Sequence, residues 1–580
     1  MLLNKLDFSH TTAGVLVLIN FILIAFVLWM STFGFDLSDE SFYSIGYQYA
    51  KQPFLNGADP YLIVYKKLFG ALNFSLTNIR ILRILLSVLS TVVLYLGVKN
   101  YFPKHNQTDK AILFNALLTG SLLSFTLGPL ALSYNTMSAI LLSLIVGCWL
   151  ILLKAKKDWV NYSLAVAVGC LFVLLGFNKI TNLALLPLIY AATVVFYCKK
   201  FGSDKKILTQ IAFFSLLLLL GAILMLAYLS NGFGNIIAVL KKFYQYFIDK
   251  ANNDPSHNFS DLLLIYYYNV KWLVKKMLLP IAIVTVAFIA QYILFKAKST
   301  TKKVGQYLGI IIGVVTFLII VVKNYYYRGG GGSGSVYQII LGYVFIGYLA
   351  LLQIFTTKKQ INIYIVLGLF SLPLIGALGT NNGLAANVLF YGSFIFLLIY
   401  YLLSTSKINW YKHGLTMAIC LLAASQIVTA VALYPYRQTT STKMVSKVSD
   451  VTFLKDIQLN THLHNLKQQL REVKNHKAEY IFTLSHQTGM ILLSNKKPYS
   501  LAWFNEIGLL KMESEISNST IPMNNVIFIL TPDFASNVEF TQMLARQNIS
   551  LSNDFSLLKT VKYFDPVINR QNVLQVYVPN

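Results

Sequence analysis

The sequence predicts an α-helical polytopic membrane protein, with about thirteen transmembrane helices and a C-terminal soluble α/β domain. Of its 580 residues, 56% are hydrophobic and 12% are charged, whereas soluble domains carry about 25% charged residues. A single soluble core rarely exceeds about 250–300 residues. The net charge of +26 comes from short Lys and Arg clusters between apolar runs. This pattern is typical of membrane topology and excludes a nucleic-acid-binding face.

Thirteen apolar runs approach the length of about 20 residues that a membrane span needs. The first run is predicted to be a retained span, because it is longer than a signal-peptide core and no Ala-x-Ala cleavage site follows it. The fifth and sixth runs are separated only by Asn178–Thr181. The predicted spans are 13–30, 80–98, 111–127, 136–153, 162–177, 182–198, 207–229, 278–295, 305–322, 337–355, 362–379, 387–404 and 414–433.

The distribution of basic residues predicts the orientation of the chain. The four short connections 128–135, 178–181, 323–336 and 380–386 hold only Lys179, Lys323 and Arg328. The connections on the opposite face hold nineteen lysines, namely Lys5, Lys99, Lys104, Lys110, Lys154, Lys156, Lys157, Lys199, Lys200, Lys205, Lys206, Lys296, Lys298, Lys302, Lys303, Lys358, Lys359, Lys407 and Lys412. The positive-inside rule therefore predicts a cytoplasmic N-terminus and an extracytoplasmic C-terminal domain. Because that domain contains no cysteine, it folds without disulfides, and we expect the bacterial inner membrane with a periplasmic tail.

The transmembrane domain, 1–435, contains two long outer connections, 31–79 and 230–277, both rich in aromatic residues. Tyr61–Asn73 has apolar residues at helical spacing with lysines on another face, which predicts a helix lying on the membrane surface. The segment 241–248 has a similar composition, with aromatic residues beside lysines, which is typical of the headgroup region.

The composition becomes polar in the C-terminal domain, 436–580. We expect a helix over 451–475, another over 535–547, and strands at 479–483, 526–531, 558–564 and 573–578, which together indicate an α/β domain. The segments Ser485–Met490 and Asn495–Pro498 follow the first strand and are assigned to the fold or to acceptor contact.

Three carboxylates lie within five positions at the outer end of the first span: Asp36, Asp39 and Glu40. Acidic residues beside a membrane are costly unless they are paired or hydrated, so they indicate a functional site. Paired carboxylates can supply a general base. The alternatives are a solvated loop and a helix N-cap at Ser38 or Asp39.

Cationic side chains suited to binding a phosphate occur on the same predicted face. Arg328 precedes the Gly-rich segment 329–335, whose backbone N–H groups could also hold an anion; the alternative is a flexible linker. Lys179 lies in a tight outer turn. Arg80 and Arg83 begin the second span, where snorkelling to lipid headgroups is the alternative. His257 is in the second long loop, and a single loop histidine often has no such role.

The pair Asp39-Glu40 just after the first span, followed by an aromatic-rich amphipathic helix, resembles the GT-C superfamily of membrane glycosyltransferases. That superfamily includes the protein O-mannosyltransferases and the bacterial aminoarabinose transferases. The resemblance extends to the number of spans, the long first outer loop and the soluble tail. It implies a GT-C-like fold, an active site at the outer membrane surface, a polyprenyl-phosphate-linked sugar donor, and a glycan, lipid or protein acceptor.

The resemblance also implies roles for individual residues. Asp39 would be the general base, Asp36 the reserve candidate for it, and Glu40 would orient a group or bind a sugar or metal. One displacement would invert the anomeric carbon. The sequence assigns no definite cofactor, and it leaves open whether the carboxylates hold a divalent cation. The leaving phosphate would be stabilised by Arg328, Lys179, Arg80, Arg83 and His257.

Three other functions are compatible with parts of the sequence. A flippase or other transporter of lipid-linked oligosaccharides would carry ionisable residues or broken helices at mid-membrane, and these spans have few. An O-antigen-type ligase or polymerase would use basic residues in a late outer loop, such as Arg328. A polymer-binding subunit without catalysis would have no transfer activity of its own.

Overall fold

The computed structural model of the chain describes residues 8–49, 60–72, 75–102, 105–154, 157–201, 204–253, 362–378, 387–404, 409–433, 435–436, 444–483, 488–500, 508–565 and 570–580, with isolated helical positions between 264 and 289. His257, Arg328, the Gly-rich segment 329–335 and most of the three predicted spans between 278 and 355 lie outside these residues.

Seven described segments are long and apolar enough to cross a membrane. They correspond to α1 (Phe8–Met30), α4 (Leu76–Val98), α6 (Tyr134–Lys154), α7 (Asp158–Asn178), α8 (Leu185–Phe201), α9 (Asp204–Leu229) and α17 (Asn409–Val428). Three more predicted spans coincide with α5 (Gln107–Leu122), which continues into η5 (Leu123–Thr126), and with the shorter apolar helices α14 (Ile363–Ala377) and α16 (Gly392–Leu403). The chain is therefore a multi-pass membrane protein, while the total of thirteen spans stays a prediction.

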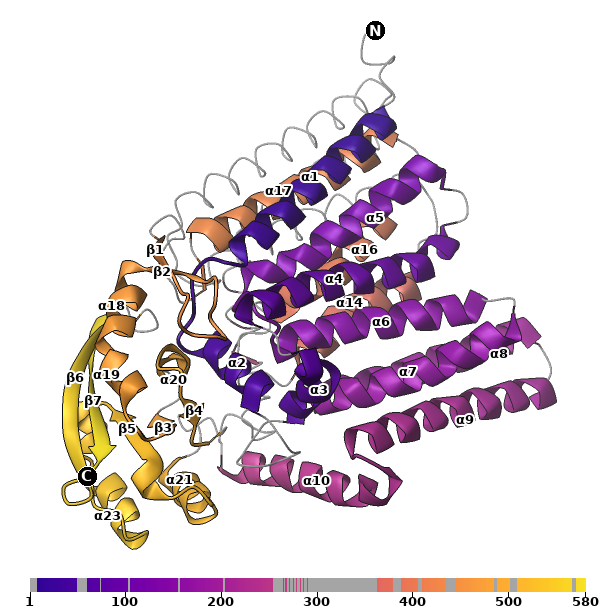
Figure 1. Cartoon of the computed structure of the whole chain (residues 1–580). Coiled ribbons are helices and arrows are strands. Elements are labelled where there is room, and N and C mark those ends of the chain that lie inside the picture. Colours follow the sequence, from indigo (N-terminus) through magenta and orange to yellow (C-terminus); the bar gives the residue numbers. More distant parts are fainter. Residues whose placement is uncertain are drawn as a thin grey trace.

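The helices lie side by side in one bundle, and the C-terminal domain sits at one end of it (Figure 1). Successive helices from α4 to α9 run in alternating directions, so their connections alternate between the two ends. Helices α7 and α9 approach each other closely: a Cβ on Gly169 would lie 2.1 Å from the Leu218 carbonyl oxygen, and one on Gly221 would lie 2.0 Å from the Val166 carbonyl oxygen. The two backbones thus touch at glycines.

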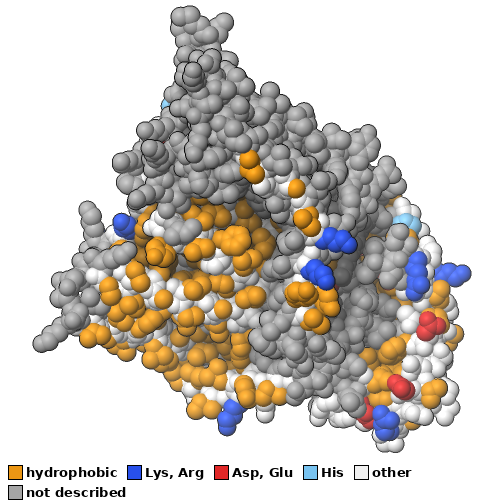
Figure 2. Space-filling model, turned by 180° about the vertical axis from the view of Figure 1, so that it is seen from behind, with side chains coloured by type: hydrophobic (Ala, Val, Ile, Leu, Met, Phe, Trp, Pro, Cys, Tyr) orange, Lys and Arg blue, Asp and Glu red, His pale blue; other side chains and the backbone are white. Residues whose placement is uncertain are grey.

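The outside of the bundle is apolar. Large side chains such as Phe21, Leu216 and Leu219 are more than half exposed, at 71%, 60% and 56%. Figure 2 shows this hydrophobic surface from behind, with charged side chains on the C-terminal domain at the opposite side. Exposed apolar area of this extent marks contact with lipid.

The first outer connection forms two short helices, α2 (Asp39–Tyr49) and α3 (Pro60–Phe69), the latter extended by η3 (Gly70–Leu72). The predicted helix beginning at Tyr61 is therefore present. Its residues 60–65 are buried inside the protein, where α3 packs against α2 and α7. The second connection contains η7 (Phe233–Asn235) and α10 (Ile236–Asn253), a helix that includes the predicted segment 241–248.

The C-terminal domain contains a five-stranded mixed sheet, whose strands lie in the order β4 (Lys497–Pro498), β3 (Tyr480–Thr483), β5 (Val526–Leu530), β7 (Arg570–Pro579) and β6 (Phe555–Asp565). Every residue of the central strand β5 is buried, as expected for a strand covered on both faces. The predicted strands are confirmed, as is the helix near 535–547, which is α22 (Pro532–Ala535) followed by α23 (Val538–Arg546).

The prediction of one helix over 451–475 was wrong in its first part. A small antiparallel pair, β1 (Met444–Lys447) with β2 (Gln458–Asn460), precedes α18 (Thr461–Gln469) and α19 (Arg471–Asn475). The backbone of Gln458 also pairs with the first outer loop, since its N–H donates to the Thr32 carbonyl at 2.8 Å. Asn460 then caps α18, its Oδ1 accepting the Leu463 N–H at 2.8 Å. Residues 458–460 therefore form a strand that pairs with other parts of the chain, where a helix had been predicted.

Candidate functional site

Asp36 organises the turn between α1 and α2. Its Oδ1 accepts the Ser38 N–H at 3.0 Å and the Ser38 hydroxyl at 2.7 Å, while its Oδ2 accepts the Glu40 N–H at 3.1 Å. These donors belong to the start of α2, where unpaired N–H groups and the helix dipole favour an anion. Asp36 is buried, so its carboxylate acts as a cap of this helix.

Glu40 forms a buried ion pair with Arg80. The Arg80 Nε donates to Glu40 Oε1 at 2.9 Å and its Nη2 donates to Oε2 at 2.5 Å. Glu40 also accepts the backbone N–H groups of Ala131 at 3.0 Å and Asp36 at 3.3 Å. The remaining donors of the guanidinium bind the carbonyls of Ser31, Phe33 and Gly34. The pair therefore ties α2 and the loop before it to α4.

Arg83 connects α4 to the loop before α6. It donates to the Pro129 carbonyl at 2.5 Å and to the Ser124 carbonyl at 2.8 Å, and its guanidinium carbon lies 4.0 Å from the centre of the Phe125 ring. Arg80 and Arg83 are 1% and 0% exposed. Neither side chain therefore snorkels to lipid headgroups, and both are held by protein groups.

Asp39 has a different environment from the other two carboxylates. It is half-buried, whereas Asp36 and Glu40 are fully buried. Its Oδ2 accepts the hydroxyl of Tyr436 at 2.6 Å, a residue just beyond the last membrane helix. The carboxylate also lies near Tyr43 on the next turn of α2. Among the three acids, Asp39 has the greatest contact with solvent.

A cluster of tyrosines lies beside Asp39. The ring centres of Tyr43 and Tyr61 are 5.9 Å apart, those of Tyr43 and Tyr134 are 6.3 Å apart, and those of Tyr61 and Tyr134 are 5.5 Å apart. Burial, followed by the charges of Tyr134 and Asp39, raises the pKa of Tyr43 well above its ordinary value. Tyr43 therefore keeps its phenolic proton at physiological pH.

Lys179 lies in the turn between α7 and η6 (Ile180–Ala184). Its Nζ donates to the Gly376 carbonyl at 2.8 Å, and the same carbonyl accepts the Tyr391 hydroxyl at 2.6 Å. Burial lowers the pKa of Lys179 to about 7. A proton on this side chain is therefore exchangeable near neutral pH, and an anion beside it would favour the charged form.

Contacts connect Lys179 to the tyrosine cluster. The preceding residue, Asn178, donates from Nδ2 to the Tyr134 carbonyl at 2.7 Å and accepts the Tyr65 hydroxyl on Oδ1 at 3.2 Å. Tyr134 in turn packs against Tyr43, which lies near Asp39. A base candidate and a cation thus belong to one contiguous set of side chains.

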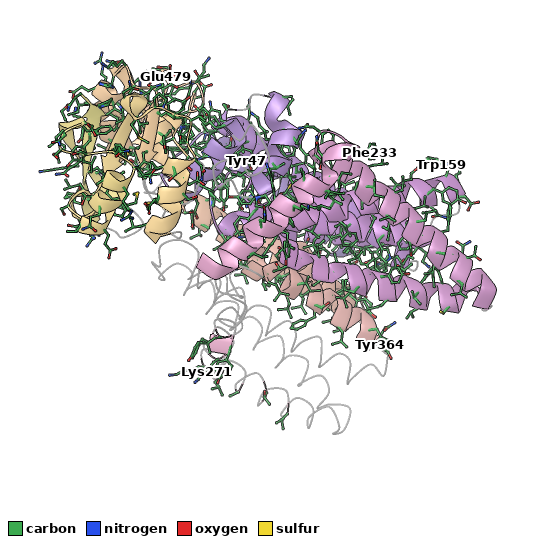
Figure 3. All side chains as sticks on the ribbon, turned by 90° about the horizontal axis from the view of Figure 1, so that it is seen from below. Tyr47, Trp159, Phe233, Lys271, Tyr364 and Glu479 are labelled. Atoms are coloured by element: carbon green, nitrogen blue, oxygen red, sulfur yellow. The ribbon has the colours of Figure 1, made fainter. Side chains whose placement is uncertain are left out.

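Six of the predicted site residues lie on or next to α2, the start of α4 and the end of α7, at the end of the bundle nearer the C-terminal domain (Figure 1): Asp36, Asp39, Glu40, Arg80, Arg83 and Lys179. In Figure 3, Tyr47 on α2 lies between the bundle and the domain that carries Glu479, while Trp159 lies at the far end. Arg328 and His257 lie outside the described residues. Within the described part of the chain, no group of three or more His, Cys, Asp or Glu side chains could hold a metal ion.

Sequence analysis missed Tyr43, Tyr134 and Tyr436 as members of this site. The aromatic richness of the first outer loop was a signal for Tyr43. No feature of the sequence indicated Tyr436, because it lies 397 positions from Asp39.

Comparison with models of known protein families found no match, and comparison with curated proteins found none either. Among solved structures, the chain is similar to ArnT from Cupriavidus metallidurans in the apo state, with 12% sequence identity and a TM-score of 0.38. The alignment covers 97% of this chain and 98% of that chain. A likeness this distant is too weak for conclusions about fold or activity.

Proposed function

We propose that the protein is an integral membrane glycosyltransferase of the GT-C type. It would transfer a sugar from a polyprenyl-phosphate donor to an acceptor hydroxyl at the outer face of the bacterial inner membrane. The observation that carries the proposal is the difference among the three acids. Asp36 and Glu40 are fully buried and hold backbone donors, whereas Asp39 is half-buried beside tyrosines. This arrangement suits one carboxylate that reacts and two that position it.

In the proposed reaction, Asp39 accepts the proton of the acceptor hydroxyl while that oxygen attacks the anomeric carbon of the sugar. The bond between the anomeric carbon and the phosphate oxygen breaks, and the lipid monophosphate leaves. Because there is one displacement, the anomeric configuration inverts. The acceptor is a glycan, a lipid or a protein that carries such a hydroxyl.

The leaving monophosphate needs a cation. We assign this role to Lys179, with Arg328 and His257 as further candidates from the sequence. Arg80 and Arg83 are instead assigned to holding the site together, because their guanidinium groups donate to Glu40 and to backbone carbonyls. Lys179 would bind the phosphate as the ammonium, which the approach of an anion favours.

The test is Asp39→Asn in membranes, with the release of polyprenyl monophosphate from endogenous polyprenyl-phosphate sugars measured by mass spectrometry. We expect a loss of about 100-fold or more, the usual contribution of a general base. Asp158→Asn is the matched control, because Asp158 is an exposed acid in the first turn of α7, at the other end of that helix from Lys179, and it should retain full activity. Unchanged release by Asp39→Asn would exclude the assignment.

The transporter alternative has its own readout. Movement of a lipid-linked oligosaccharide across proteoliposomes by the purified protein, without release of monophosphate, would replace the proposed function with transport.

A further inference from the structure

We infer that the C-terminal domain is part of the proposed active site, with Thr488, Gly489 and Tyr436 as positioning residues that hold Asp39 in place. This inference rests on the proposed function for Asp39. It assigns the soluble domain a direct role in the reaction at the membrane surface.

The first contact is made by the start of α20 (Gly489–Leu493). The Gly489 N–H donates to the Leu37 carbonyl at 2.8 Å. The Thr488 hydroxyl is 3.1 Å from the Ser38 carbonyl oxygen and 3.3 Å from that of Leu37. These acceptors are the two residues immediately before Asp39. The C-terminal domain therefore fixes the backbone from which the carboxylate extends.

The approach requires glycine at position 489. A Cβ there would lie 2.7 Å from the Leu37 Cα and 2.8 Å from the Ser41 Oγ. Because real Cβ atoms are not found so close to such atoms, any larger residue would push α20 and the start of α2 apart. A displacement of about 1 Å can lower a reaction rate by roughly 100-fold when it misplaces a reacting group.

The second contact reaches the carboxylate itself. Helix α17 ends in a π-helical turn, Thr429–Leu433, and Tyr436 follows it on the chain leading into the C-terminal domain. The Tyr436 hydroxyl donates to Asp39 Oδ2 at 2.6 Å. Isolated π-helical turns in α-helices often occur at functional sites. Here the turn precedes a side chain that orients the proposed base.

The far end of α2 is also held by the C-terminal domain. The Tyr49 hydroxyl donates to the Lys496 carbonyl at 3.4 Å, and α2 packs against both α20 and β4. One segment of the domain, 488–498, thus contacts both ends of the helix that carries Asp39. A shift of this segment would be transmitted to the carboxylate.

The experiment uses the full-length protein in detergent with three variants: Gly489→Ala, Thr488→Val and Tyr436→Phe. Gly368→Ala is the matched control, because Gly368 is exposed on α14 and a Cβ there would meet no atom within 4 Å. Two readouts are compared. One is hydrogen–deuterium exchange at residues 38–43, with β5 as an internal reference, and the other is the rate of monophosphate release.

For Gly489→Ala we expect exchange at residues 38–43 to rise at least about tenfold while β5 is unchanged, because the added Cβ separates α20 from α2. The kcat should fall about tenfold or more with KM within about twofold, the pattern of a misplaced reacting group. Thr488→Val keeps the side-chain shape and removes the hydroxyl. For this variant we expect a smaller rise in exchange and a smaller fall in kcat. For Tyr436→Phe we also expect a smaller fall in kcat than for Gly489→Ala.

The outcomes separate the inference from the proposed function. Unchanged exchange at residues 38–43 in both Gly489→Ala and Thr488→Val would overturn the inference whatever the activity. The inference would also be overturned if Gly489→Ala and Thr488→Val raised the exchange but kept the wild-type kcat, while Asp39→Asn abolished activity. Full activity of Asp39→Asn would instead overturn the proposed function, and exchange would still report the contact. If Gly489→Ala raises exchange in β5, the domain has unfolded and Thr488→Val decides.

Discussion

Glu40 and Arg80 form a two-point ion pair in which both side chains are almost completely buried, with N–O distances of 2.9 and 2.5 Å. The same carboxylate accepts the N–H of Ala131. Three segments of the chain therefore meet at one acidic group: the start of α2, the second turn of α4 and the loop before α6. The position of Asp39, one residue before Glu40, depends on this junction.

Breaking this pair should destabilise the protein strongly. Arg80→Met leaves the Glu40 carboxylate buried without its cation, and removal of one partner from a buried pair costs about 3–5 kcal/mol. We expect a large fall in the melting temperature in detergent, measured by thiol-reactive dye fluorescence or by static light scattering.

The matched control is Arg546→Gln. Arg546 forms an ion pair of similar length with Glu513 at 2.7 Å, but its side chain is 56% exposed, and exposed pairs add little to stability. Its melting temperature should equal that of the wild type. Equal effects of the two variants would show that burial of the Glu40–Arg80 pair has no special importance.

Substitutions of Asp36 and Asp39 should differ in their effects on the stability of the protein as well as on its activity. Asp36→Ala removes the acceptor of the Ser38 and Glu40 N–H groups at the start of α2, and loss of such a cap costs about 0.5–2 kcal/mol. Asp39→Asn keeps an oxygen acceptor for Tyr436 and should not lower the melting temperature. If Asp39→Asn lowered the melting temperature, its loss of activity would be explained by impaired folding and not by the loss of a general base.

Lys179 should give the protein a pH-dependent stability. Its pKa is about 7 in the folded state because of burial, and about 10.4 in the unfolded chain. Between these values the unfolded state binds more protons, so stability rises with pH in this window. Below pH 7 the cost of the buried charge is fully present, and above about pH 10 it is absent.

Lys179→Met lacks this contribution. We therefore expect the variant to have a higher melting temperature than the wild type near pH 6.5. The difference between the two melting temperatures should shrink as the pH approaches 9.5. Lys67→Met is a suitable control, since Lys67 is only half-buried on α3. A difference that does not depend on pH would contradict the role of burial.

The contact between α7 and α9 should tolerate no side chain larger than glycine. Gly221→Ala places a Cβ about 2.0 Å from the Val166 carbonyl oxygen, so the helices must separate, and such overpacking costs about 1–3 kcal/mol. We expect a lower melting temperature and less monodisperse protein in size-exclusion chromatography. Gly14→Ala is the control, because Gly14 is exposed on the membrane helix α1 and its Cβ would meet no atom within 4 Å.

Elements defined by local composition could be predicted from the sequence, whereas those defined by distant partners could not. The apolar run 80–98 forms a helix because a segment in lipid must satisfy its backbone hydrogen bonds internally, and α4 spans Leu76–Val98. Gln458–Asn460 has the composition of a helix, but its backbone pairs with β1, and Gln458 also pairs with the first outer loop.

The same distinction between local composition and distant partners applies to the candidate site. Asp36, Asp39 and Glu40 stand out because acids are rare beside a membrane span. Their different roles depend on partners elsewhere in the chain: Arg80 for Glu40 and Tyr436 for Asp39. Charge and spacing identify the cluster, but only the folded chain separates the proposed base from the residues that support it.

The contact between Thr488 and Leu37 also has a consequence for biosynthesis. The two residues are 451 positions apart, which corresponds to roughly 20–90 s of translation at about 5–20 residues per second. During that time the loop that contains Leu37 has been made, but its partner has not. The loop therefore lacks these hydrogen bonds until the C-terminal domain has been made, so a new protein completes this contact only late in its synthesis.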